Sequence, residues 1–309
     1  MFPRAIYLPY FFGAEKTMYG GRPMNRAYQT IIDAEKLARH VDAPGWRIID
    51  CRFDLMNKEA GQQRYAEAHI PNALYAHLED DLSGPQSAGT GRHPLPSADL
   101  LADRFSSWGI DGQTQIVAYD GQSGALASRL WWLSRWLGHD RVAVLSGGFA
   151  AWQSAGFSTN ARLPEITATR FSARVDDSLW ISTRDLQTQL DKGKALLVDA
   201  REEARFRGEV EPLDKIAGHI PGSVNSPFEW NLDVDGKFLT PEKLQAHLSQ
   251  ILTNFTEKKI IHSCGSGVTA CHNILAMEII GLSGSLLYPG SWSAWITDPK
   301  RPVSGLKES

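Results

Sequence analysis

The chain has 309 residues, of which 42% are hydrophobic, so it is long enough to form two globular domains. Its net charge of −3 argues against a protein that binds nucleic acid or a membrane surface, and no apolar run approaches the ~20 residues that a transmembrane helix needs. The three cysteines, Cys51, Cys264 and Cys271, are odd in number and lack the spacing of a metal site. A disulfide framework is therefore not expected, and we predict a reducing, cytoplasmic location.

Residues 1–26 are predicted to form an N-terminal extension. The apolar run from Ile6 to Gly13 is short and interrupted by Pro9, which disfavours a secretory signal. Met24 offers an alternative start of translation.

Apolar spacing predicts alternating helices and strands along the first half of the chain. The expected helices are 28–41, 97–108 and 125–137, with Ser97 as the N-cap of the second. The expected strands are 46–50, 115–119 and 142–145. Trp131, Trp132 and Trp136 lie at core spacing on the third helix, so we expect them to pack inside.

The second half of the chain repeats landmarks of the first half in the same order. An apolar strand ending in Asp-x-Arg comes first, then His-Ile-Pro, then a strand followed by a glycine-rich loop, and finally a segment containing Gly and Trp. The paired landmarks are Asp50 and Asp199, His69 and His219, Asp120 and Cys264, and Trp152 and Trp295. Four landmarks in one order indicate a duplicated domain rather than a short-period repeat.

The alternation of strands and helices predicts that each half forms a parallel sheet flanked by helices. The predicted fold class is therefore α/β, with two tandem domains. We expect an extension at 1–26, a first domain at 27–157, a linker at 158–170 where Ser, Thr, Asn and Pro gather, and a second domain at 171–309.

A cysteine loop in the second half offers reactive chemistry. The apolar strand 259–263 runs into Cys264-Gly265-Ser266-Gly267-Val268-Thr269-Ala270, and a helix is expected over 268–280. Two glycines let the backbone N–H groups turn inward, and the helix start adds partial positive charge, so the site favours a thiolate nucleophile. The alternative is a small buried cysteine beside a glycine turn, and the loop alone does not decide between the two.

This seven-residue loop resembles the active-site loop of the rhodanese superfamily, and specifically that of 3-mercaptopyruvate sulfurtransferases. The thiosulfate branch usually carries basic residues where this chain has Gly265 and Ser266. The resemblance covers about residues 28–303 and implies tandem rhodanese-like domains in which Cys264 carries sulfur as a persulfide, without a cofactor or a metal. The first domain, with Asp120 in place of the cysteine, is then an inactive copy.

The resemblance also implies roles for other residues. Ser266 would hydrogen-bond the donor or relay a proton, His69 would help to orient that serine, and Arg205 would bind the donor anion. The loop residues expected to contact the donor are Gly265, Gly267, Val268 and Thr269. Each role has a structural alternative: Ser266 could cap the following helix, His69 could bind backbone at a strand start, and Arg205 could form a surface ion pair.

One position departs from the family pattern. Mercaptopyruvate enzymes typically have a second substrate arginine after Glu-x-Glu-Pro, and this chain has Leu213 there. Lys215 is a shifted substitute, and Arg92-His93 in a glycine-rich loop is a further candidate for the cleft.

The predicted function is transfer of sulfur from 3-mercaptopyruvate to a thiol, cyanide or thioredoxin-like acceptor by a monomeric enzyme. Thiosulfate is the alternative donor. A phosphatase of the same fold would need a longer loop ending in arginine, whereas Ala270 stands there. A non-catalytic binding module would be expected to lack the cysteine in both halves. Cys51 and Cys271 are predicted to be inert.

Overall fold

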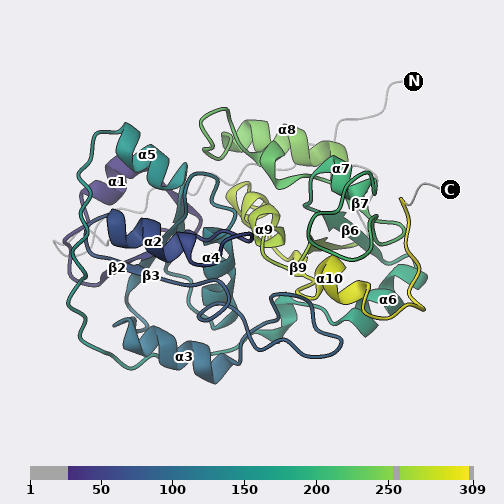
Figure 1. The fold of residues 1–309 in the computed structure, drawn as a ribbon. Coiled ribbons are helices and arrows are strands. Elements are labelled where there is room, and N and C mark those ends of the chain that lie inside the picture. The colour runs from purple at the N-terminus through teal and green to yellow at the C-terminus, as the bar shows by residue number, and fades with distance from the viewer. Residues whose placement is uncertain (1–26, 253–257, 306–309) are drawn as a thin grey trace, which may run out of the picture.

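The computed structural model of the protein describes residues 27–252 and 258–305, so the predicted extension at 1–26 lies outside the described residues. Two α/β halves lie side by side, the first drawn in purple to teal and the second in green to yellow (Figure 1). Each half is built on its own parallel sheet, as the alternation of strands and helices predicts.

The first half holds a five-stranded sheet in the order β1-β5-β4-β2-β3. Its strands are β1 (Ile31–Ile32), β2 (Trp46–Asp50), β3 (Ala73–Tyr75), β4 (Gln115–Tyr119) and β5 (Val142–Leu145). Its helices are α1 (Ala34–Ala38), α2 (Ala60–Glu67), α3 (Ala98–Ser107), α4 (Ala127–Trp136) and α5 (Gly148–Ser154). All neighbouring strands are parallel.

The predicted helix at 28–41 is wrong in its first part. Ile31 and Ile32 instead pair with Val144 and Leu145 and form the edge strand β1. Asp33 then caps the shorter helix α1, because its side chain accepts the N–H of Lys36 at 2.7 Å. The other predicted strands are confirmed, and Ser97 caps α3 as expected.

The second half holds a four-stranded parallel sheet in the order β7-β6-β8-β9. Its strands are β6 (Ala195–Asp199), β7 (Val224–Asn225), β8 (Lys259–Ser263) and β9 (Leu286–Leu287). Its helices are α6 (Thr183–Asp191), α7 (Glu203–Phe206), α8 (Pro241–Leu252), α9 (Ala270–Ile279) and α10 (Ser291–Trp295), with 3-10 turns η1 (Asp177–Leu179) and η2 (Phe228–Asn231).

The duplication extends to buried ion pairs. In the first half Arg52 contacts Asp50 at 2.6 Å and lies over the ring of Phe149. In the second half Arg201 contacts Asp199 at 2.7 Å and lies over the ring of Trp292. In both halves this ion pair ties the end of a central strand to the last helix of that half, which fixes the carboxyl edge of the sheet.

The two halves share one apolar core. Helices α4 and α9 pack against each other between the sheets (Figure 1), and the same cluster of buried side chains includes Trp132 from one half and Ile274 from the other. Trp131 and Trp136 are buried as predicted. Cys264 belongs to this cluster, so the candidate nucleophile lies where the halves meet.

Across residues 27–252 and 258–305, no helix combines the length and apolar character needed to cross a membrane.

His262 on β8 makes the acid stability of this core testable. It is 2% exposed, neither ring nitrogen has a hydrogen-bond partner among the described residues, and burial lowers its pKa to about 3. Between about pH 6.5 and 3 the unfolded chain therefore binds a proton here that the folded chain does not. As the pH falls through this range, the free energy of unfolding decreases, at a rate that reaches about 1.4 kcal/mol per pH unit. Because the unfolded histidine is half protonated at pH 6.5, we expect His262→Leu to lose about 1 kcal/mol less stability than wild type between pH 6.5 and 5.5, measured by urea unfolding. An unchanged pH slope would contradict a neutral buried His262.

Candidate active site

Cys264 lies in a pocket of about 70 Å³ that both halves of the chain line. The residue follows β8 directly, and its backbone N–H donates to Ser291 Oγ at 3.0 Å, which fixes the end of the strand. From the first half the pocket receives Leu55, Leu78, Arg92, His93 and Leu126. From the second half it receives Arg205, Leu213, Cys264, Gly265, Ser266, Val268 and Thr269.

The loop after the cysteine directs a backbone donor at the sulfur. The N–H of Gly267 lies 3.1 Å from Cys264 Sγ, and Gly267 has φ of +78°. A Cβ at this position would lie 2.4 Å from Pro289 O, so both the backbone angle and the space require glycine. A donor held this close stabilises negative charge on the sulfur.

The first half shows what this kind of loop binds. Asp120 occupies the place of Cys264 in the repeat, and its carboxylate accepts N–H groups from four residues of its own loop at 2.8–3.3 Å. Those residues are Gln122, Gly124, Leu126 and Ala127. Burial raises the pKa of Asp120, and the four donors oppose that rise. The repeated loop thus acts as an anion cradle, and in the first half a carboxylate already fills it.

Ser266 contacts a histidine from the other half of the chain. Its hydroxyl lies 2.7 Å from His93 Nδ1, and both side chains are buried. Burial, assisted by Arg129 and Arg92, lowers the pKa of His93 to about 3, so the imidazole is neutral at physiological pH. With its proton on Nε2, which faces Glu79 Oε1 at 3.8 Å, His93 accepts the Ser266 hydroxyl through Nδ1. The neutral ring thereby orients the Ser266 hydroxyl, which lines the Cys264 pocket.

His69 does not lie at Ser266, contrary to the role that the family resemblance implies. Its Nδ1 lies 2.8 Å from Tyr65 O and its Nε2 lies 3.0 Å from Arg162 O, so backbone carbonyls satisfy both nitrogens. The ring stacks on Tyr65, and the residue bridges to Asn160. This is the structural alternative for a histidine before Ile-Pro, and His93 takes the place beside the serine.

Arg205 lies at the pocket with one edge held by a carboxylate. Its Nη2 and Nε contact Glu211 at 2.7 and 3.3 Å, and Glu211 also accepts the backbone N–H of Leu213 at 3.1 Å. Both Nη atoms also face the cysteine loop, because a Cβ on Gly265 would lie 3.5 Å from Arg205 Nη2 and 3.7 Å from Arg205 Nη1. The ion pair with Glu211 therefore positions the guanidinium without removing it from the pocket.

Arg129 on α4, a fully buried arginine of the first half, contacts the cysteine loop. Its Nη1 donates to Gly267 O at 3.0 Å, and its Nη2 donates to His93 O at 3.2 Å. The side chain is fully buried, which lowers its pKa, and among the described residues its hydrogen-bond partners include no carboxylate. The guanidinium thereby couples the cysteine loop to the histidine that contacts Ser266.

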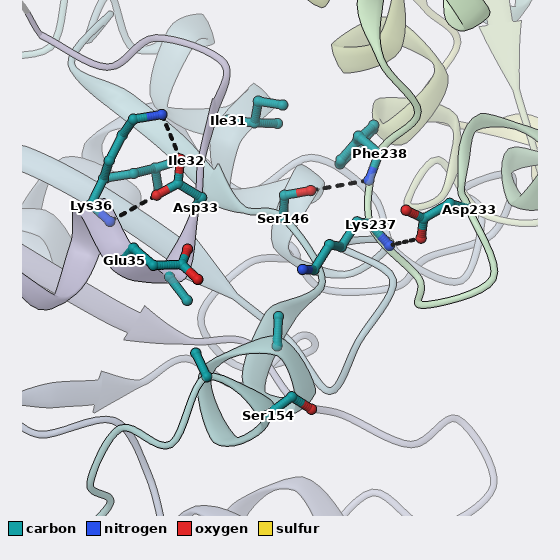
Figure 2. A pocket seen from close by; sticks show the side chains of 13 residues that line it. Ile31, Ile32, Asp33, Glu35, Lys36, Ser146, Ser154, Asp233, Lys237 and Phe238 are labelled. Carbon is teal, nitrogen blue, oxygen red and sulfur yellow. Dashed lines mark hydrogen bonds and ion pairs between the residues drawn. The ribbon is translucent and has the colours of Figure 1, made fainter.

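A larger groove of about 390 Å³ lies between α1, α5 and residues 233–238 (Figure 2). Its polar groups bind one another: Lys36 Nζ contacts Asp33 at 2.5 Å, and the N–H of Phe238 donates to Ser146 Oγ at 3.0 Å. No thiol or histidine lines it. It lacks the chemistry of the Cys264 pocket and marks a contact between the two halves.

The other two thiols are buried, and the Cys271 thiol donates to Gly267 O of the cysteine loop at 3.5 Å. Burial raises the pKa of Cys51 well above its ordinary value and that of Cys271 to about 12. Both therefore stay protonated at neutral pH, as expected for inert cysteines. Within the two described ranges, no group of three or more His, Cys, Asp or Glu side chains is placed to hold a metal ion.

Comparison with known families matches the duplication seen in the structure. The sequence profile of the "Rhodanese-like domain" family matches residues 33–155 and, a second time, residues 182–298. The chain belongs to the rhodanese-like family. The first match contains every strand of the five-stranded sheet except β1, and the second match contains the whole four-stranded sheet and Cys264. This tandem rhodanese-like protein is a sulfurtransferase.

Relatives of the same architecture carry both donor names. The chain is 45% identical over 276 residues to a "Probable 3-mercaptopyruvate sulfurtransferase" of Pseudomonas aeruginosa, covering 89% of this chain and 97% of the relative. It is 33% identical over 279 residues to the thiosulfate sulfurtransferase of Bos taurus, covering 87% and 92%. The solved 3-mercaptopyruvate sulfurtransferase from Leishmania major superposes with a TM-score of 0.75 at 31% identity, covering 86% of this chain and 73% of that one.

The rhodanese-like site contains residues that the sequence patterns indicate weakly or not at all. Arg129 and Arg135 both lie in the largely apolar stretch from Leu126 to Leu137, so the pattern indicates polar groups on a buried helix without singling out Arg129. Glu79 and Asp214 carry no comparable signal, because each lies among other charged residues in a loop.

His93 and His69 can be compared directly by mutation. We expect His93→Gln to lower the kcat of sulfur transfer roughly 100-fold, because Ser266 loses the ring that orients its hydroxyl. His69→Gln should keep kcat in the folded fraction, since this ring contacts only backbone carbonyls and Tyr65. Steady-state kinetics with circular dichroism as the folding control give the answer. If His69→Gln lowered kcat more than His93→Gln, His69 and not His93 would be the functional partner of Ser266.

Proposed function

We propose that the protein is a 3-mercaptopyruvate sulfurtransferase in which Cys264 carries the sulfur. The observation that carries this assignment is the buried thiol beside the N–H of Gly267, with a neutral Ser266–His93 pair next to it. The relative of 45% identity named for this activity supports the same donor.

The first step makes a persulfide. The Cys264 thiolate attacks the donor sulfur, so the Sγ–S bond forms and the bond from that sulfur to C3 of the donor breaks. The electron pair leaves on C3 as the enolate of pyruvate. C3 needs one proton, and the donor thiol loses one. Ser266, which lies 2.7 Å from His93, is placed to relay that proton.

The second step restores the enzyme. An acceptor thiolate or cyanide attacks the outer sulfur, the S–S bond to Cys264 breaks, and its electron pair returns to Sγ as the thiolate. We propose a thiol, cyanide or a thioredoxin-like protein as acceptor. A reducing compartment keeps Cys264 available for this cycle, in line with the cytoplasmic location that the cysteine usage predicts.

The charges around the pocket favour a donor with one negative charge. Three arginines (Arg92, Arg201 and Arg205) are in ion pairs with three carboxylates (Asp199, Glu211 and Asp214), and His93 is neutral. A single carboxylate therefore needs only a rearrangement of existing pairs, whereas thiosulfate brings a dense double negative charge. Thiosulfate is the second candidate donor, since the bovine relative uses that name and Leu213 removes one expected substrate arginine.

The nucleophile is tested by Cys264→Ser. A hydroxyl cannot form a persulfide, so sulfur transfer should fall to background. Intact-mass measurement of wild type should show one added sulfur after mercaptopyruvate, lost on treatment with cyanide. Sulfur on Cys51 or Cys271, or turnover by the serine variant, would contradict the assignment.

The donor is tested by the ratio of kcat/KM for mercaptopyruvate to that for thiosulfate. We expect wild type to prefer mercaptopyruvate, because Gly265 and Ser266 bring no cation to the loop. Ser266→Lys should shift the ratio towards thiosulfate relative to Ser266→Ala, which removes the same hydroxyl without adding charge. If the two variants give equal ratios, loop charge does not select the donor.

A further inference from the structure

The position of the second substrate arginine is filled by Leu213, yet a second guanidinium does reach the pocket. It belongs to Arg92 in the glycine-rich loop of the first half, and Arg92 and Leu213 both line the Cys264 pocket. The same two residues also line an adjoining groove of about 410 Å³, so they stand between the buried thiol and the outer surface.

Arg92 and Arg205 approach the same point of the cysteine loop from opposite halves of the chain. A Cβ built on Gly265 would lie 2.8 Å from Arg92 Nη2 and 3.5 Å from Arg205 Nη2. Gly265 directly follows Cys264, so both cations border the space beside the reactive sulfur. Glycine here leaves that space open.

A carboxylate already bridges the two guanidinium groups. Asp214 Oδ1 is ion-paired with Arg92 Nη1, and Asp214 Oδ2 lies 3.6 Å from Arg205 Nη2. The Oδ2 atom is buried and has no hydrogen-bond partner among the described residues. The pair of arginines is thus spaced for one carboxylate, and its present occupant is incompletely satisfied.

The backbone of Arg92 is held by both halves. Its N–H donates to Ser293 Oγ at 3.1 Å, next to the cysteine loop, and its carbonyl accepts Gln86 Nε2 at 2.7 Å. The Arg92 side chain is one-quarter exposed, so it can exchange partners through the outer groove. These contacts preorganise the guanidinium at the mouth of the pocket.

We propose that Arg92 is the second cation of the donor site and binds the carboxylate of a small 2-oxo acid together with Arg205. The inference rests on the proposed function, because it assigns a carboxylate donor to the same pocket. The donor carboxylate replaces Asp214 on Arg92. The first domain thereby supplies the positive charge that is missing at Leu213 in the second domain.

The competing explanation is that Arg92 has only a structural role, because its ion pair with Asp214 joins the halves. Both explanations predict a loss of function for Arg92→Gln alone. They differ in a protein that carries Asp214→Asn, where no ion pair remains to be broken. In that protein a donor-binding role predicts a further effect of Arg92→Gln, and a purely structural role predicts none.

The test measures alkylation of Cys264 with iodoacetate and with iodoacetamide, followed by peptide mass spectrometry. Their rate ratio reports recognition of a carboxylate without any sulfur chemistry. We expect Arg92→Gln to lower this ratio roughly tenfold or more, both in wild type and in the Asp214→Asn protein. Arg207→Gln, which removes an exposed arginine paired with Glu209, is the matched control and should leave the ratio unchanged. An unchanged ratio for Arg92→Gln in the Asp214→Asn protein overturns the proposal.

Kinetics with mercaptopyruvate provide the second measurement. Arg92→Gln should raise KM roughly tenfold or more with a smaller change in kcat, and Leu213→Arg in the Arg92→Gln protein should recover part of that loss. A fall in kcat alone would contradict a binding role. If wild type fails to turn over mercaptopyruvate while the alkylation ratio still depends on Arg92, the proposed donor is wrong and the carboxylate site stands.

Discussion

The guanidinium of Arg129 is the interaction on which the active site depends. It lies fully buried on α4 and donates to the carbonyls of Gly267 in the cysteine loop and of His93 in the opposite half. Burying a charge without a carboxylate is costly unless several dipoles solvate it, so those carbonyls cannot move away independently. The consequence is a fixed relation between the sulfur, the hydroxyl of Ser266 and the imidazole that accepts it. The packing of α4 against α9 holds the same relation from the apolar side.

Duplication of one fold has produced two different loops. Both halves place a glycine-rich loop at the end of a central strand; the first loop directs backbone N–H groups at the Asp120 carboxylate, and in the second the N–H of Gly267 lies 3.1 Å from Cys264 Sγ. In the first half the carboxylate of Asp120 fills the cradle permanently, which leaves no room for chemistry there. In the second half the loop holds the smaller thiol group of Cys264, which can gain a sulfur atom and lose it again. The first half instead contributes His93 and Arg92 to the Cys264 pocket of the second half.

The charges at the mouth of the pocket are arranged in ion pairs that a donor can rearrange. Glu211 is ion-paired with Arg201 and Arg205, and Asp214 with Arg92, so these three arginines have anionic partners before the donor arrives. The neutral imidazole of His93 adds no charge. Such a site favours a ligand whose carboxylate replaces one of the protein's carboxylates. It stabilises a ligand with an additional negative charge less well.

The sequence by itself determined the duplication, the parallel sheets, most of the strands and the loop around Cys264, because these depend on local apolar periodicity and on short-range glycine geometry. The boundaries 1–26, 27–157, 158–170 and 171–309 stay a prediction. The short edge strand Ile31–Ile32 escaped detection, since two residues pair only through the distant Val144 and Leu145. The choice of His93 over His69 escaped it as well. Both histidines follow plausible local patterns, and only the packing of α4 on α9, with Arg129 between the two loops, brings one of them to Ser266. The same packing placed Arg92 beside Arg205, which no spacing in the chain could show, because 113 residues separate them and the contact exists only across the interface between the halves.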